Sequence, residues 1–279
     1  METVLAGNGN GNGGGGNGNG NGGGPGGDDA LELIGVVRDF LPSHPDFDVV
    51  PSQGYGQYMW NVAATLGDHG RAVYEGGGFK VQQHARDASG RDISWTLYDP
   101  ARGDSPAIGG NPDGGSIDSA ESFDQWFRDI PGVNMSTLHT VVGERRDDGE
   151  FAGMYEINIP QFYPIDGMLL GDDSDHNRFF TYEIVAEFTY DAAAGYQMYF
   201  TSDDDAWLFI DGRMVADLGG INGSTEHWVE LNRLDLIDGQ EYRMRLLKTD
   251  RSDASCRFHL VTDVPLRSVL PLTVLAMFD

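Results

Sequence analysis

Three consecutive carboxylates, Asp203, Asp204 and Asp205, are the residues of this sequence whose type and spacing point most clearly to ligand chemistry. They follow an alternating apolar stretch, residues 196–200, which predicts a strand that ends just before them. Neighbouring like charges destabilise one another, and a cation removes that cost. Because calcium prefers clusters of carboxylate and carbonyl oxygens, the triplet predicts a calcium site. The alternative is a solvated acidic turn, since Asp is also a common turn residue.

The triplet leads directly into a hairpin. Residues 207–210 form an aromatic-rich apolar run that is typical of a strand buried on both faces. Asp211 and Gly212 then supply the positive φ angles of a two-residue turn, and residues 213–218 return as the partner strand. We therefore expect the three acids on an edge loop between two strands.

Four more polar residues are candidate ligands. Asp217 and Asn222 lie close to the hairpin in sequence, on its second strand and just after its glycine exit. Asp173 and Asp175 belong to a second acidic loop further upstream. Such a loop is usually solvated surface, and it would complete the shell of an ion only if it folds near Asp203.

Several separate signatures give the chain a resemblance to a known family. They are residues 37–40 with 44–47, residues 123–134, residues 176–177 with 180–183, and residues 203–220. Together they resemble the fibro-slime family, a branch of the protective-antigen-type β-sandwich modules found in adhesins, flocculins and some glycosidases. The resemblance covers about residues 35–266.

This resemblance implies a calcium-dependent extracellular carbohydrate-binding or adhesion module. In lectin members of the wider group, an Asp-Asp pair at this strand end holds a calcium ion whose free coordination positions take sugar hydroxyls. By position that pair falls on Asp203 and Asp204, with Asp205 beside it. The partner would be a glycan or an extracellular matrix polymer. The alternative is a structural subunit or spacer of an extracellular fibre or slime matrix, capable of self-assembly, in which calcium only makes a loop rigid.

The charge and the cysteine content of the chain exclude some binding partners and some cross-links. The formal net charge is -26 at pH 7, so nucleic acid and anionic membranes would be repelled. Such a surface suits saline or calcium-rich surroundings, and salt adaptation with a metal-free triplet is a third interpretation. The single cysteine, Cys256, excludes an internal disulfide and is expected to be buried in a strand.

The pattern of elements predicts an all-β fold, namely an antiparallel β-sandwich or flattened barrel with one short helix and long loops. Residues 1–29, rich in Gly and Asn, are expected to be a disordered tether, and residues 30–279 the β domain. The helix is expected between Asp118, which forms a capping-box-like start with Glu121, and Pro131.

The sequence contains few indications of cellular location or of catalytic activity. No secretory signal is visible, so an extracellular or cell-surface location is inferred from the resemblance alone. The apolar tail from residue 264 is interrupted by Arg267 and Pro271 and is too short to cross a bilayer as a helix, so a closing strand is expected. The sequence has no nucleophile elbow, metalloprotease helix motif, phosphate loop or zinc-type spacing of Cys and His. We therefore expect a binding or structural protein and not an enzyme.

Overall fold

The large sheet contains most of the strands of the protein. The computed structural model describes residues 30–270 apart from 113–114, 116, 173 and 253–255. In spatial order, the strands of this sheet are β12 (Arg213–Leu218), β11 (Ala206–Ile210), β14 (Glu241–Asp250), β9 (Phe180–Thr189), β1 (Ala30–Phe40), β7 (Asn134–Arg145), β8 (Tyr155–Ile159), β15 (Phe258–Thr262), β10 (Gln197–Ser202) and β13 (Thr225–Glu230).

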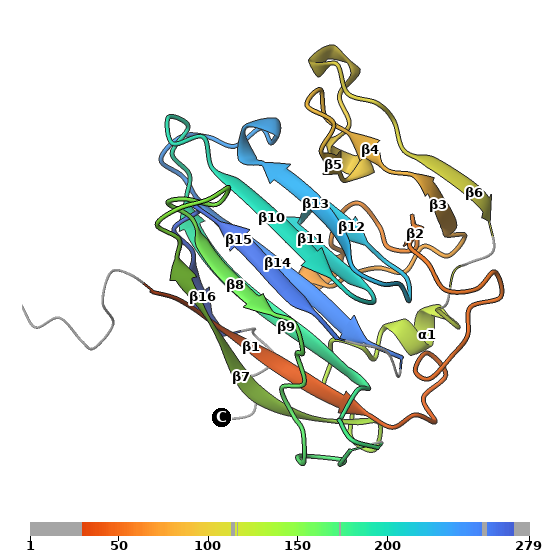
Figure 1. The fold of residues 1–279 in the computed structure, drawn as a ribbon. Coiled ribbons are helices and arrows are strands. Elements are labelled where there is room, and N and C mark those ends of the chain that lie inside the picture. The colour runs from red at the N-terminus through yellow and green to blue at the C-terminus, as the bar shows by residue number, and fades with distance from the viewer. Residues whose placement is uncertain (1–29, 113–114, 116, 173, 253–255, 271–279) are drawn as a thin grey trace, which may run out of the picture.

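The sheet curls into a closed shape (Figure 1). Every pair of neighbouring strands is antiparallel, and the short β16 (Arg267–Val269) pairs with β9 outside the main order. β12 and β13, the two ends of the order, contact each other, so the sheet approaches a flattened barrel. The predicted all-β class is therefore confirmed.

The long connection between β1 and β7 forms a cover beside β12 and β13, where Figure 1 shows its two small sheets. It also carries the single α-helix of the described residues. Its elements are β2 (Tyr58–Met59), η1 (Asp68–Gly70), β3 (Phe79–Gln83), β4 (Ala85–Arg86), β5 (Asp92–Ile93), η2 (Trp95–Leu97), η3 (Pro100–Arg102), β6 (Ile108–Pro112) and α1 (Ala120–Phe123). A further 3₁₀ helix, η4 (Leu231–Arg233), follows β13.

Two cores hold these layers together. The main core lies inside the curled sheet and includes Leu33, Ile184, Phe200, Leu208 and Leu246. The second lies where the cover meets the outer face of β11 and β14, and includes Phe40, Phe47, Phe123, Trp126 and Trp207. Because β11 is covered on both faces, residues 207–210 are all buried, as their composition predicts.

The predicted hairpin and strand alternation are also found. Asp211 and Gly212 have φ angles of 50° and 75°, which a two-residue turn of this type requires. On β14, Tyr242 and Met244 face the core while Arg243 between them is exposed.

The predicted helix is much shorter than expected. α1 spans only four residues, and its N-cap is Ser119, which exchanges hydrogen bonds with Ser122, in place of the predicted Asp118 and Glu121 pair. The carbonyl of Trp126 accepts a 2.6 Å bond from the hydroxyl of Thr181 on β9. The amide of Ile130, which would bond that carbonyl in a helix, donates instead to the Asn134 side chain. The α-helix has already ended before Trp126, because the amides of Gln125 and Trp126 donate to carbonyls three residues back in the chain instead of four.

The two ends of the chain are described in part. The predicted tether, residues 1–29, lies outside the described residues, as do residues 271–279 of the apolar tail. β16 is the expected closing strand. Cys256 is buried and free of disulfides, as predicted, but it lies before β15 and not within a strand. Across the ranges that the structure describes, no helix has the length and apolar character needed to cross a membrane.

Asp39 fastens the connection between β8 and β9 to the sheet. Near the end of β1, it is 1% exposed and accepts hydrogen bonds through Oδ2 from Leu170 N (2.7 Å) and Asn177 Nδ2 (2.9 Å). Its other oxygen, Oδ1, is buried without a hydrogen-bond partner among the described residues. Burial raises the pKa of this carboxyl from 3.8 to about 6.

Asp39→Asn is expected to raise the free energy of unfolding at pH 7 and to change it little at pH 4. Because the pKa of Asp39 is higher in the folded chain than in the unfolded chain, wild-type stability falls as the pH rises from about 4 to about 6 and then levels. The asparagine oxygen can accept both bonds with no charge to desolvate. Urea unfolding should show a gain of up to about 3 kcal/mol at pH 7. An equal gain at pH 4 would contradict this cause.

Candidate functional site

The acidic triplet lies at the end of the barrel where β10 and β14 end and the chain leaves β12. Asp203, Asp204 and Asp205 are 6%, 3% and 1% exposed. A solvated acidic turn would leave these carboxylates in water, so the charges require partners inside the protein. The three residues meet different partners.

Asp205 forms a buried ion pair. Its Oδ2 accepts from Nε (2.8 Å) and Nη2 (2.6 Å) of Arg251, and its Oδ1 accepts from the Gly220 amide (2.5 Å). Arg251 is fully buried, lies 4.7 Å from the centre of the Trp126 ring, and donates through Nη1 to the carbonyl of Asp46 (2.9 Å). The charge of Asp205 is thus compensated by a guanidinium within the fold.

Asp204 is held in a left-handed backbone conformation, with φ at 53°. Its Oδ2 accepts from the Arg251 amide (2.8 Å) and the Ser252 hydroxyl (3.2 Å), and its own amide donates to the Asn222 carbonyl. Burial raises the pKa of this carboxyl, and the bond and charge of Arg251 oppose that rise. Asp204 therefore joins three separate segments.

Lys248 contacts the first residue of the triplet through the backbone. This fully buried ammonium donates to the Asp203 carbonyl (2.7 Å) and to the Ser202 hydroxyl (2.9 Å). It is one of only two lysines in the chain. A buried lysine is uncommon unless it is paired, so its presence marks this region as one of concentrated negative charge.

Asp250 is a further member of the cluster, and it was not among the residues predicted from the sequence. It ends β14, is 1% exposed, and its carboxylate lies beside the Cys256 thiol and the Asp204 carboxylate. Burial raises its pKa well above 3.8, nearby Asp204 raises it further, and Lys248 opposes both. One sequence signal was available: positions 248 and 250 continue the inward alternation of β14, so a Lys and an Asp face inward.

The cluster carries more negative than positive charge. Among the described residues of the cluster, four carboxylates, Asp203, Asp204, Asp205 and Asp250, and two cations, Lys248 and Arg251, are buried together. With every group ionised, two negative charges are left over. Two protons or one divalent cation would balance them, and the raised pKa values of Asp204 and Asp250 express the same imbalance.

The other predicted ligands have different fates. Asn222 lies beside the triplet, where its side chain bonds Gly220 O and the Thr225 hydroxyl. Asp175 is exposed and bonds Ser174 and Arg178, with no contact to the triplet among the described residues. Asp173 lies outside the described residues. Among the residues that the structure describes, no group of three His, Cys, Asp or Glu side chains is arranged as a ready metal site.

Asp217 is part of a separate buried network. Its carboxylate accepts from the indole nitrogens of Trp95 (2.7 Å) and Trp207 (3.0 Å) and from the amides of Trp60 and Gly219. Burial raises its pKa to about 6, and these donors oppose the rise. Both oxygens are engaged in joining the cover to β12, which favours a structural role.

The segment that carries the cluster matches a known domain family. Residues 139–261 match the PA14 domain. The match begins within β7 and ends within β15, so it includes the triplet, Lys248 and Asp250. A PA14 match agrees with the protective-antigen-type group expected from the sequence, whereas the narrower fibro-slime assignment stays a prediction.

Relatives match half of this chain or more, over short parts of their own length. Protein psiJ of Dictyostelium discoideum is 29% identical over 167 residues, which are 54% of this chain and 23% of psiJ. Protein psiR of the same organism is 26% identical over 249 residues, 84% of this chain and 21% of psiR. The chain thus spans less than a third of the length of these curated relatives. A solved GH31 α-xylosidase from Xanthomonas citri aligns over 86% of this chain and 22% of its own, with 14% identity and a TM-score of 0.23, too low to indicate a shared fold.

Arg251→Gln is expected to lower the free energy of unfolding by about 3 to 5 kcal/mol, because it leaves the Asp205 charge buried and uncompensated. The backbone amide that binds Asp204 is kept in this variant. The matched control is Arg86→Gln, which breaks the exposed Arg86–Asp92 pair and should cost less than about 1 kcal/mol. Urea unfolding followed by tryptophan fluorescence measures both. Equal, small losses in the two variants would contradict the structural role of Arg251.

Proposed function

We propose that this chain is a carbohydrate-binding or adhesion module of an extracellular or cell-surface protein, not an enzyme, and that calcium binds at Asp203 and Asp204. Two independent lines support the proposal. Residues 139–261 match the PA14 domain, and the sequence signatures resemble fibro-slime proteins of the same wider group. Both lines meet at the strand end that carries the acidic triplet.

The observation that carries the calcium part is the uncompensated charge of the buried cluster. Asp250 is buried close to Asp204, and the charge of Asp204 adds to the burial that raises the pKa of Asp250. No three acids of the described residues are arranged as a metal site, so Asp203, Asp204 and Asp250 would have to move toward one another to bind calcium, with an oxygen of Asn222 as a further ligand. Because Asp205 is already paired with Arg251, we assign it a positioning role and not a ligand role.

Calcium would supply two positive charges at a place where the fold leaves two negative charges over. In a lectin-type mode it would also offer open coordination positions to sugar hydroxyls. The chain's own contribution would be to hold Asp204 by the Arg251 amide, the Ser252 hydroxyl and the Asn222 carbonyl, so that the loop is arranged before a ligand arrives.

The second candidate is a structural matrix subunit in which calcium only stiffens the loop. The burial of Asp204, at 3% exposure, favours it, because a sugar must reach the ion directly. Sedimentation at increasing protein concentration separates the candidates. Reversible self-assembly in calcium, with no ligand on a glycan array, would support the matrix subunit and count against the binding module.

Calcium titration calorimetry on the full chain at pH 7 should give a binding signal that the Asp203→Asn, Asp204→Asn double variant loses. The variant removes two carboxylates from the donor set and keeps side chains of similar shape. Asp175→Asn is the matched control, because Asp175 is an exposed acid that contacts Arg178. It should bind calcium like the parent. The absence of any calcium signal in the parent would refute the calcium part of the proposal.

A further inference from the structure

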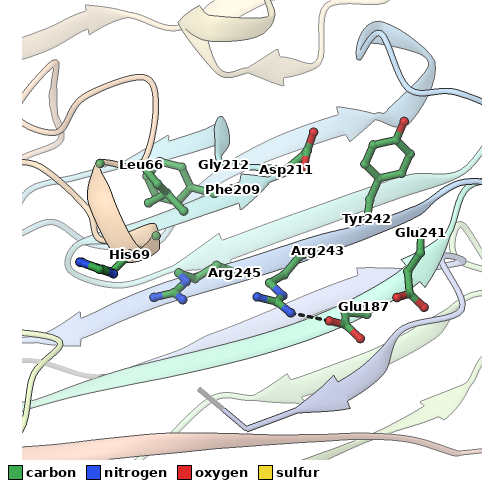
Figure 2. A pocket seen from close by; sticks show the side chains of 12 residues that line it. Leu66, His69, Glu187, Phe209, Asp211, Gly212, Glu241, Tyr242, Arg243 and Arg245 are labelled. Atoms are coloured by element: carbon green, nitrogen blue, oxygen red, sulfur yellow. Dashed lines mark hydrogen bonds and ion pairs between the residues drawn. The ribbon is translucent and has the colours of Figure 1, made fainter. Parts of the chain in front are cut away.

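A separate groove lies on the outer face of the sheet, along the opposite half of β14. Its volume is about 550 Å³, within the range of small-molecule sites. β14 and β11 line it, and the segment around η1 lies along one side (Figure 2). None of the predicted site residues lines it.

One end of the groove is basic. Arg243 and Arg245, two positions apart on β14, both point into it, and His69 lies beside Arg245 in Figure 2. Arg71 and Arg128 line an adjoining shallow recess that also includes Arg245. In a chain with a net charge of -26, four arginines around these two adjoining hollows are a local concentration of positive charge, and Asp124 pairs with one of them, Arg128.

Three guanidinium groups lie close together at this end. Arg245 donates to Glu183 (2.7 Å), and the buried Arg38 donates to Glu183 (3.0 Å) and to Asp129 (3.0 Å). Burial lowers the pKa of Arg245, and the charges of Arg243 and Arg38 lower it further, against the opposing charge of Glu183. A carboxylate bound between Arg243 and Arg245 would offset this repulsion.

Arg243 is the accessible member of the pair. Its side chain is 53% exposed and donates to Glu187 (2.6 Å), which Arg267 also contacts from outside the groove. Asp211 and Glu241 line the rest of the groove. These two carboxylates can accept from hydroxyl groups but would repel a second acidic group.

We propose that the groove binds a saccharide unit that carries one carboxylate, a uronate, with the carboxylate on Arg243 and Arg245 and the ring hydroxyls toward Asp211 and Glu241. A neutral sugar would leave the basic end unused, and a polyanion would meet the two acids and the negative surface of the protein. The inference rests on the proposed carbohydrate-binding function but does not involve calcium.

The test titrates the full chain with glucuronate, and with glucose as the neutral comparison, in the presence of a calcium chelator. Glucuronate should bind, and glucose should bind roughly tenfold more weakly or not at all, because only glucuronate offers a carboxylate to the arginines. Affinity should fall as salt is raised, since the contact is ionic and partly exposed.

Arg243→Gln should weaken glucuronate binding roughly tenfold or more. Arg86→Gln is the matched control: its side chain is also 53% exposed and pairs with one carboxylate, Asp92, but it does not line the groove. It should bind like the parent. The Asp203→Asn, Asp204→Asn variant should also keep glucuronate binding, because its substitutions lie at the other end of β14.

Three results would overturn the groove proposal: no glucuronate binding in the parent, equal binding of glucose, or equal loss in the Arg243 and Arg86 variants. Glycan binding that requires calcium and vanishes in the Asp203, Asp204 variant would then leave the proposed function in place without the groove. Glucuronate binding in chelator with no calcium signal in the parent would support the groove and refute the calcium site.

Discussion

The buried ion pair between Asp205 and Arg251 is the contact on which the organisation of this end of the protein depends. Through it the turn after β10 meets the segment after β14, and Arg251 reaches on to the Asp46 carbonyl, 205 residues away in sequence. A buried pair is weak evidence for stability on its own, because desolvation opposes the attraction. Its consequence here is geometric: it allows one arrangement of the strand ends, and Asp204, Lys248 and Asp250 take their places around it.

The glycine pair that follows β12 shows how tight this arrangement is. The Gly220 amide bonds Asp205 and the Gly219 amide bonds Asp217, so adjacent residues connect the triplet to the tryptophan network. Gly220 has φ at 105°, and a Cβ there would lie 2.5 Å from the carbonyl oxygen of Gly56. Only glycine permits that approach, which brings the cover against the sheet.

The sequence correctly predicted the structural features that depend only on residues near one another in the chain. Strand alternation and the Asp211–Gly212 turn follow from side-chain direction and φ preference, and both are found. The predicted helix is shorter because the backbone changes to i→i+3 bonds after Phe123, and further on the carbonyl of Trp126 accepts from Thr181 of β9 in place of a helical amide.

The position of the triplet was predicted, but its burial and its partners were not. Nothing in the spacing of the three acids indicates that Arg251 takes Asp205, since ion-pair partners are selected by tertiary packing. To predict Asp250 as a member of the cluster, one must know that it faces inward on β14 and that it lies close to Asp204. Strand alternation in the sequence indicates the inward direction, whereas only the folded structure shows the closeness to Asp204. Asp217 was a candidate ligand because it is close to the triplet in sequence, yet its carboxylate accepts hydrogen bonds from the indole nitrogens of Trp95 and Trp207.

β14 connects the two sites proposed for this protein. It carries Arg243 and Arg245 in the groove near its start and Lys248 and Asp250 in the charged cluster at its end. At about 3.3 Å per residue, Asp250 lies five to seven residues, roughly 17 to 23 Å, from the two arginines, too far for an ion there and a groove ligand to touch. An ion at the cluster would stabilise the end of the strand that presents the arginines, while leaving their contacts unchanged. Calcium would then act on the groove through stability, and sugar recognition would not require an exposed ion at a buried triplet.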